Sequence, residues 1–347
     1  MRKFFFRFLL VVFPIAVIVT MVNYTIDPAN IFSTNVYVKG IAEILSAGHN
    51  VDNISNYDER LLQEQMVYRL TATPDIVVLG SSRVMQIGSD FFPGKKVLNC
   101  GVSHANIKDI VAITGLLDSM KRMPAVIILN ADPGLICQGG TSEWKSLDGY
   151  YHSISGKLNG TANSNTSPGL YTFKKKLSSL FSLQYFQSAV QFIGKGRTKK
   201  YTDVGNQLPA LYGRLSDGTV SYSYAYMHPD SVLAAATANE EGRKGHFGDV
   251  DKEQEALLER LLEYLAVRKV QVQLCLLPYH PAFYKSVNDN HSQQLLQYAA
   301  WFKDLAARKK LSLTGNFDPA VYQIPAASFY DDSHSSKESL RKILLQQ

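Results

Sequence analysis

The chain has 347 residues, of which 46% are hydrophobic and 19% are charged, and its formal net charge is +6. These values are ordinary for a globular protein, so they exclude a disordered chain, a collagen-like fibre and a protein with many membrane spans. The modest positive charge is compatible with an anionic partner, such as a phospholipid headgroup or an acidic polymer, without requiring one.

The N-terminus is an apolar stretch, Phe4 to Val22, with Arg7 as its one charged residue. A helix of about 20 apolar residues crosses a bilayer. Basic residues flank the N-terminal side and the next charged residue is Asp27, so the positive-inside rule places the N-terminus in the cytoplasm and the rest outside. No small-residue cleavage site follows the apolar stretch. We therefore predict a single-pass signal anchor over residues 1–23, with a cleaved signal peptide as the alternative.

The remainder divides into a connector, residues 24–56, and one domain, residues 57–347. The connector reads as irregular, with a short helix near Ile41–Ser46. Nothing in its composition indicates a strand.

Short apolar runs bounded by glycine or proline recur along the domain, which is typical of strands buried on both faces. These runs are Asp75–Gly80, Lys96–Cys100, Ala125–Asn130, Val270–Leu277 and, more weakly, Leu311–Thr314. Helical patterns occupy Tyr57–Leu70, Ile107–Lys121, Lys252–Arg268, Ser292–Lys309 and Ser336–Leu345. The alternation predicts an α/β domain with three layers, α/β/α, around a parallel sheet. Ligands bind such sheets outside the carboxyl ends of the strands.

A long insertion, about residues 138–251, separates the third and fourth predicted strands. It is polar at first, then helical over Leu170–Gly194, then rich in tyrosine at Tyr222, Tyr224 and Tyr226. We predict a small subdomain or lid over the strand ends, because a structureless loop of this length is uncommon. The tyrosines fit either packing or stacking on a sugar. The basic clusters Lys174–Lys176 and Lys195–Lys200 fit either a solvated face or contact with anionic lipid or polymer.

A serine follows the first buried strand directly, in the sequence Gly80-Ser81-Ser82-Arg83. A serine here projects its hydroxyl at the strand end. If a helix begins at this point, its free N–H groups can stabilise an oxyanion. The alternative is a helix cap, a position that serine also favours.

Near the C-terminus, Asp331 stands three residues before His334. At this spacing the carboxylate can accept a hydrogen bond from imidazole Nδ1 and leave Nε2 free to take a serine proton. The alternative is an exposed turn with an incidental histidine.

Taken together, these blocks resemble the SGNH/GDSL hydrolase superfamily, in which strand–Gly-x-Ser begins the domain and Asp-x-x-His ends it. The resemblance covers about Asp75–Ile136 and Val270–Leu345. It implies the flavodoxin-like SGNH fold. It also implies that Ser82 is the nucleophile, with His334 as general base and Asp331 as the acid that orients it.

The same resemblance implies an oxyanion hole formed by the N–H groups of Ser82 and Gly101. In the family's third block an asparagine side chain adds a donor. Here that block reads Asn130-Ala131-Asp132, with Asp132 in the asparagine place, and a carboxylate repels an oxyanion. The hole therefore has either Asn130 as its third donor or the two N–H groups alone.

Three further residues are candidate substrate contacts: Arg83, Asp132 and His280. Arg83 fits an anionic group or a structural ion pair equally well, and His280 fits a substrate contact or a turn. The segment Gly101–Ala105 is a near miss for the Gly-x-Ser-x-Gly nucleophile elbow, because it lacks the final glycine.

The sequence thus predicts a membrane-anchored serine esterase or O-acyltransferase whose domain lies in the periplasm or outside the cell. The overall plan is similar to that of exported SGNH proteins that acylate envelope polymers. The expected substrate is a polysaccharide or a small acyl ester, and a membrane protein that delivers the acyl donor is an expected partner. No cofactor, metal or nucleic acid is expected. The alternatives are a non-catalytic SGNH-shaped binding or assembly protein and a secreted lipase-like esterase.

Overall fold

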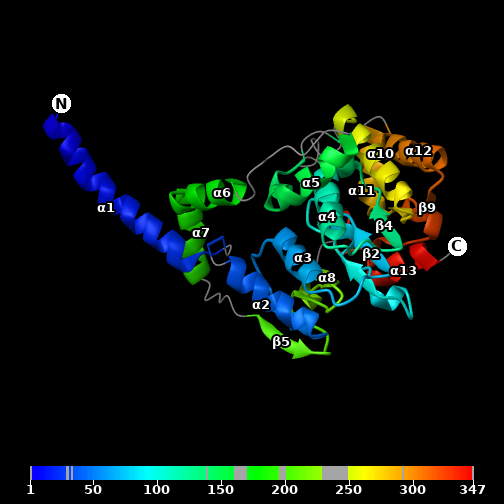
Figure 1. The fold of residues 1–347 in the computed structure, drawn as a ribbon, viewed down its shortest axis with the longest axis horizontal. Helices are drawn as coiled ribbons and strands as arrows, with labels where there is room; N and C mark the ends of the chain where they lie inside the picture. Colours follow the sequence, from blue (N-terminus) through cyan, green and yellow to red (C-terminus); the bar gives the residue numbers. More distant parts are fainter. Residues whose placement is uncertain are drawn as a thin grey trace.

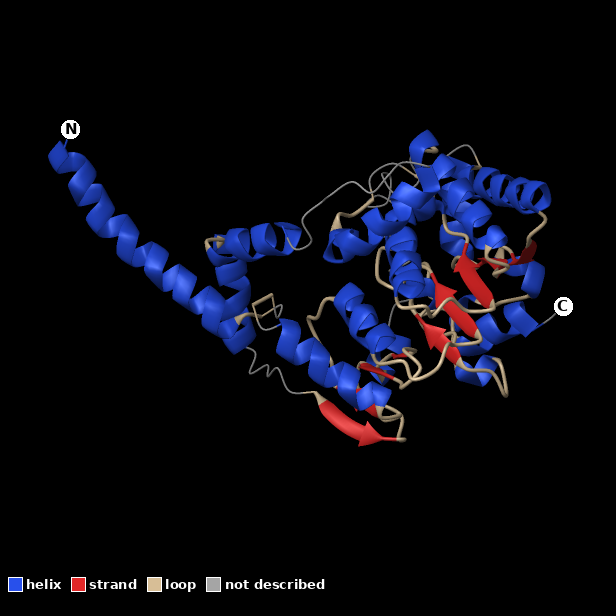
Figure 2. Cartoon of the chain, viewed as in Figure 1, coloured by secondary structure: helices blue, strands red, loops and turns tan. Residues whose placement is uncertain are grey.

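The computed structural model describes residues 2–28, 31–32, 34–137, 140–159, 170–194, 201–228, 249–290 and 293–345. Its centre is a sheet of five parallel strands in the order β3-β2-β4-β8-β9 (Figure 2). The strands are β2 (Ile76–Leu79), β3 (Val97–Asn99), β4 (Val126–Asn130), β8 (Gln271–Leu276) and β9 (Ser312–Gly315). Counted within this sheet the order is 2-1-3-4-5, as in flavodoxin-like doubly wound sheets. The predicted α/β class and parallel sheet are confirmed.

Five predicted helices are present to within two residues. They are α3 (Glu59–Tyr68), α4 (Ile107–Ser119), α10 (Lys252–Val267), α12 (Gln294–Lys309) and α13 (Lys337–Leu345). Three of the described helices were not predicted, α5 (Asp148–Asn159), α8 (Tyr224–Met227) and α11 (Pro281–Asn290). Single 3-10 turns occupy Pro133–Leu135, Glu143–Leu147, Pro319–Tyr322 and Ala326–Ser328.

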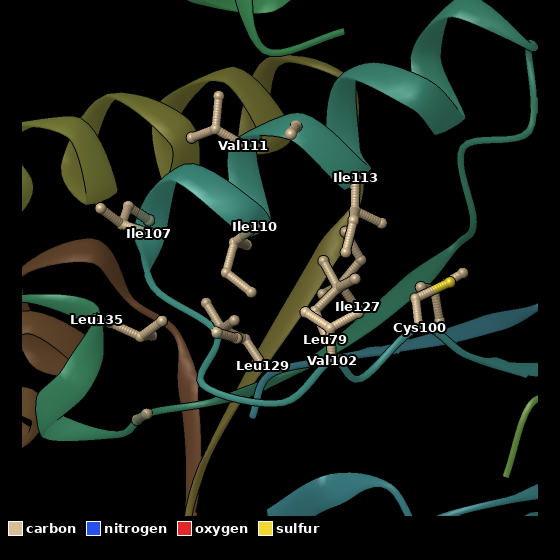
Figure 3. Packing of buried hydrophobic residues seen from close by; sticks show 14 of the residues in the cluster. Leu79, Cys100, Val102, Ile107, Ile110, Val111, Ile113, Ile127, Leu129 and Leu135 are labelled. Atoms are coloured by element: carbon tan, nitrogen blue, oxygen red, sulfur yellow. The ribbon is translucent and has the colours of Figure 1, made fainter. Parts of the chain in front are cut away.

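One face of the parallel sheet carries the larger core. Figure 3 shows Leu79 and Ile127 of the sheet lying against Ile110 and Ile113 of α4. The same cluster takes in buried side chains from α3, α10, α11 and α12. A capping box at Asn106 starts α4 at the edge of this core, because its side chain accepts from two N–H groups of the first turn.

The opposite face is covered more thinly than predicted. Ile76, Val78, Ile128 and Cys275 pack there against α13 and against two 3-10 turns, η1 (Ser82–Val84) and η2 (Ser89–Phe91). Among the described residues of the β2–β3 connection there is no α-helix, only these turns. A helix beginning at Ser82 was one possibility, and the structure has only the 3-10 turn η1 there, because the 17 residues between the two strands close the connection with short turns.

A second, antiparallel sheet joins the connector to the insertion. Its order is β5-β1-β6-β7, from β1 (Asn50–Asp52), β5 (Thr202–Gly205), β6 (Gly213–Arg214) and β7 (Val220–Ser221). The connector also holds α2 (Thr34–Ser46), a longer helix than expected. The connector is thus more ordered than predicted. Three-residue strands have too few positions for a period-2 pattern, and the partners of β1 lie far along the chain.

The described part of the insertion is helical as well as stranded. It contains α5, α6 (Leu170–Leu180), α7 (Leu183–Gly194) and the short α8 (Tyr224–Met227). Helices were expected over Leu170–Gly194, and α6 and α7 lie there. The predicted lid falls partly on residues 138–139, 160–169, 195–200 and 229–248, which lie outside the described residues.

The N-terminal apolar stretch forms one helix, α1 (Arg2–Ile26), which projects away from the α/β core (Figure 1). Within the part of the chain that the structure describes, no helix meets the length and apolarity expected of a segment crossing a bilayer. The single-pass anchor over residues 1–23 stays a prediction.

Gly80 is the point where β2 turns toward η1, with a φ of +152°, and a Cβ added there would stand 2.4 Å from the Asn130 Cβ. Gly80→Ala should therefore destabilise the fold by about 1–3 kcal/mol, the range for an overpacked core. Gly94→Ala is the matched control, because Gly94 also has a positive φ, +77°, but nothing lies within 4 Å of its added Cβ. Denaturant unfolding measures both. Equal losses in the two variants would contradict a close-contact role for Gly80.

Candidate functional site

Ser82 lies in η1, at the carboxyl end of β2. Beside it, the Ser81 hydroxyl donates to Asn130 Oδ1 at 3.0 Å instead of capping the turn. Strand β2 pairs with β3 on one side and β4 on the other, so this is the point where the direction of the chain along the sheet reverses. Ligands of doubly wound sheets bind at this position.

Ser82 and His334 are in direct hydrogen-bond contact. His334 Nε2 and Ser82 Oγ are 2.8 Å apart, although 252 residues separate them in the sequence. His334 Nδ1 is 2.7 Å from Asp331 Oδ2. The structure thus brings the three residues predicted from the Gly-x-Ser and Asp-x-x-His blocks into one chain of hydrogen bonds. Distances of about 2.6–3.2 Å between nucleophile and base are those of an activated serine.

The backbone around Asp331 fixes its carboxylate. Asp331 Oδ1 accepts the N–H groups of Ser333 and His334, both at 2.8 Å, so only Oδ2 faces the imidazole. Burial by itself would raise the pKa of Asp331. The hydrogen bond and charge of His334, with the two N–H donors, outweigh burial and lower the pKa well below its ordinary value. Asp331 is therefore ionised at neutral pH and holds Nδ1 of His334 in its N–H form.

The insertion contributes a further donor to this carboxylate. The Tyr226 hydroxyl, on α8, donates to Asp331 Oδ2 at 2.8 Å and lies 3.3 Å from His334 Nδ1. Its ring centroid is 4.7 Å from that of Tyr222, and both rings lie 6.3 Å from the His334 ring. Sequence reasoning noted the tyrosine-rich patch but did not assign it to the site. Its one signal was the density of tyrosines.

Burial and the neighbouring Asp331 charge raise the pKa of Tyr226 well above its ordinary value. The hydroxyl therefore stays protonated and acts as a donor at neutral pH. It stabilises the ionised form of Asp331 from the side opposite the backbone.

Arg83 is buried, and its guanidinium bonds to other groups of the protein. Its Nη1 lies 2.8 Å from Asp132 Oδ2, and its Nε donates to the Ser333 carbonyl at 3.1 Å. Nη2 donates to the carbonyls that follow β8, at Leu277 and Pro278. The guanidinium also lies 3.8 Å from the centroid of the Tyr279 ring. The sequence allowed either an anionic substrate contact or a structural ion pair at Arg83, and the structure shows the ion pair.

The other two candidate substrate contacts are also engaged within the protein. Besides its ion pair with Arg83, Asp132 accepts the Gly134 N–H at 3.0 Å and caps the following 3-10 turn. His280 is only 1% exposed, and its Nδ1 accepts the Ala282 N–H at 3.2 Å. Burial lowers the pKa of His280, against the opposing charge of Asp332 and Asp331. His280 is thus closed to solvent and Asp132 is half-buried, and a substrate contact at either residue stays a prediction.

Two of the three expected oxyanion donors, Gly101 and Asn130, already make hydrogen bonds within the protein. The Gly101 N–H donates to Asn99 Oδ1 at 2.8 Å, while Asn99 Nδ2 donates to two carbonyls of the Ser82 connection, at Val84 and Ile87. Asn130 uses Oδ1 for the Ser81 hydroxyl, and its Nδ2 faces the Cys275 carbonyl at 3.4 Å. In this arrangement neither Gly101 nor Asn130 presents a free donor beside Ser82. A role in an oxyanion hole would require these bonds to be exchanged.

Across the described ranges, no three histidine, cysteine, aspartate or glutamate side chains are grouped so that they could hold a metal ion.

The chain matches no protein-family model, and a search of curated proteins finds no significant relative.

Arg83 should be the most sensitive ion-pair residue of the site. Replacing it by methionine leaves Asp132 and several carbonyls without their donor, which should lower the free energy of unfolding by about 3–5 kcal/mol. The control is Arg341→Met, because Arg341 pairs with Asp90 at the surface, and surface pairs contribute roughly 0–1 kcal/mol. Denaturant unfolding compares them. A loss at Arg83 no larger than that at Arg341 would contradict the role.

Tyr226→Phe should destabilise the protein in a pH-dependent way. Loss of a donor raises the lowered pKa of Asp331, and a hydrogen bond to a charged group contributes about 1.5–3 kcal/mol. Stability from a lowered carboxyl pKa is present above the ordinary value, about 3.9, and is lost as pH falls through the lowered pKa. The difference in the free energy of unfolding between wild type and variant should therefore be largest at neutral pH and become smaller in acid.

Unfolding free energies measured at neutral and acidic pH test this. Tyr224→Phe is the control on the same helix, because the Tyr224 side chain is exposed. A difference for Tyr226→Phe that stays constant across pH would speak against its bond to the ionised carboxylate.

Proposed function

We propose that this chain is a serine-dependent acyl-ester hydrolase or O-acyltransferase with the SGNH fold, acting on O-acyl groups, acetyl groups above all, of an exported or envelope polysaccharide. The observation that supports this most is the contact between Ser82 Oγ and His334 Nε2, at 2.8 Å, with Asp331 on the far nitrogen of the ring. The flavodoxin-like strand order and the place of Ser82 at the reversal point are consistent with it.

In the proposed reaction, Ser82 Oγ attacks the ester carbonyl while His334 Nε2 takes the hydroxyl proton. The tetrahedral intermediate collapses, the acyl group stays on Ser82, and the leaving alcohol takes the proton from His334. Water or a sugar hydroxyl then attacks the acyl-serine, with His334 as base and then as acid. Water gives hydrolysis, and a sugar hydroxyl gives transfer. Asp331 stays ionised and stabilises the imidazolium formed in each step.

The oxyanion would be held by backbone N–H groups at Ser82 and Gly101 and by Asn130. The Ser81 side chain does not cap η1, so it leaves the first N–H groups of this turn without a side-chain acceptor. For Gly101 and Asn130 to contribute, the Gly101 N–H must leave Asn99 Oδ1, and Asn130 Nδ2 must turn from the Cys275 carbonyl, when substrate binds. Each such donor is worth about 10²–10³ in rate.

The proposed location is outside the cytoplasmic membrane, with α1 as a single-pass anchor. Exported chains meet surface polysaccharides, and a membrane protein that delivers the acyl donor is the proposed partner. The aromatic rings of Tyr222, Tyr226 and Tyr330 lie within 6.1 Å of one another beside His334, centroid to centroid. Tyr330 is buried, so Tyr222 and Tyr226, which are half-buried, are the rings proposed to contact a sugar acceptor.

A second candidate function is polysaccharide binding without catalysis. It is favoured by the bonds that already occupy the Gly101 N–H and the Asn130 side chain. Under this alternative the Ser82–His334 contact would remain, but the chain would turn over no ester.

The test uses the full chain with a chromogenic acetyl ester, with and without a soluble oligosaccharide, and follows acetate and acetylated sugar by mass spectrometry. Ser82→Ala should lower product formation by about 10³-fold or more. Ser81→Ala is the matched control, because its hydroxyl bonds to Asn130 and not to His334; it should stay within about tenfold of wild type. Wild-type turnover no higher than that of Ser82→Ala would favour the binding protein.

A further inference from the structure

Helices α6 and α7 form a hairpin that is fastened to α1 through one buried side chain. Asn23, near the end of α1, is inaccessible to solvent, and its Nδ2 donates to three carbonyls at the α6–α7 turn. These are the carbonyls of Ser179, Leu180 and Ser182, at 3.1, 3.0 and 3.0 Å. The carbonyls of Ser179 and Ser182 also accept backbone N–H groups, from Ser182 and Phe186, so Asn23 adds a side-chain bond to a turn that the backbone already orders.

A second contact lies just beyond the end of α1. The Tyr185 hydroxyl, on α7, donates to Asp27 Oδ1 at 2.7 Å, and the Tyr185 ring packs edge-on against Phe32, 6.2 Å away. Figure 1 shows α6 and α7 beside the C-terminal half of α1, apart from the parallel sheet. The three helices therefore form one unit, in which α1 comes from the N-terminus and α6 and α7 come from the insertion.

The outer surface of this unit is apolar. Along α6 and its end, Phe173, Leu177 and Phe181 recur every four residues, and all three are exposed. On α7 the exposed apolar residues are Leu183, Val190 and Ile193. Exposed apolar residues that repeat along one side of a helix mark an interaction surface, because water solvates them poorly.

Helix α1 shows what kind of partner covers this surface. Its exposed apolar residues include Leu10, Phe13, Ile15, Ile18 and Met21. At about 100° per residue these positions are spread around the helix instead of along one stripe. A protein surface covers one side of a helix, whereas lipid surrounds it. Helices α6 and α7 both pack against α1.

All the charged side chains in the segment that contains α6 and α7 are basic. From Leu158 to Thr202 the sequence has seven lysine and arginine residues and no aspartate or glutamate. Lys174, on α6, is exposed next to Phe173. Helices with an apolar side and lysine-rich polar positions lie in the headgroup region of bilayers, held there in part by anionic lipids.

We infer that the α6–α7 hairpin is a second lipid contact of this protein: it lies in the headgroup region of an anionic bilayer, beside α1. This inference concerns lipid binding and does not depend on the esterase proposal.

The test places single cysteines at Leu177 and Val190 of the full chain, labels them with an environment-sensitive fluorophore, and mixes the protein with phosphatidylcholine–phosphatidylglycerol vesicles. The native Cys100, Cys137 and Cys275 are buried, so they should not react. Lipids spin-labelled near the headgroup quench a fluorophore in that region. Ser188→Cys, on another side of α7, and Val267→Cys, exposed on α10, are the controls.

The expected result is strong quenching and a blue shift at positions 177 and 190, with little change at 188 and none at 267. Replacing Lys174 and Lys176 by glutamine should weaken quenching, as should vesicles without phosphatidylglycerol. Labels at 177 and 190 that stay water-exposed while the protein floats with vesicles would overturn the inference. Shielding found in native membranes but not in pure lipid would also overturn it, in favour of a protein partner. Unchanged thermal midpoints establish that the variants are folded.

Discussion

The site depends on the buried guanidinium of Arg83, which follows the proposed nucleophile in the sequence. It bonds to Asp132 after β4, to the carbonyls after β8 and to the Ser333 carbonyl between Asp331 and His334. Three segments far apart in the chain are thereby joined to the turn that carries Ser82. A buried charge is tolerated only when its donors are satisfied, so these segments are constrained to meet at one point. The same constraint makes Arg83 unsuited to bind substrate.

Two further sets of bonds act on the same site from outside the parallel sheet. Backbone N–H groups hold Asp331 Oδ1, and Tyr226 from the insertion holds Oδ2 together with His334. Tyr226 depends in turn on the small antiparallel sheet, which joins the insertion to the connector. An insertion that looks separate from the core in the sequence therefore completes the hydrogen-bonding of Asp331.

The parts of the structure that follow from local pattern could be predicted from the sequence. The apolar run of β2 and the Gly80 turn place Ser82 at a strand end, and the three-residue spacing of Asp331 and His334 sets their bond. Contacts over long separations could be predicted only where the family resemblance links the residues, as it does for Ser82 and His334. Tyr226 is 105 residues from Asp331, and no periodicity links them.

Other features depend on side-chain choices that spacing leaves open. Asn99 accepts the Gly101 N–H two residues away, and the Ser81 hydroxyl donates to Asn130, which ends the neighbouring strand of the sheet. The sequence is compatible with either substrate binding or an ion pair at Arg83. The position of Asp132 in the folded chain decides in favour of the ion pair.

The central claim is that Ser82 is a nucleophile activated by His334. The most direct measurement is labelling of the intact chain with a serine-directed fluorophosphonate, followed by peptide mapping, for wild type and His334→Ala. We expect one adduct, on Ser82, formed far more slowly without the imidazole that accepts its proton. No adduct on Ser82, or labelling of Ser82 at the same rate in both proteins, would contradict the account.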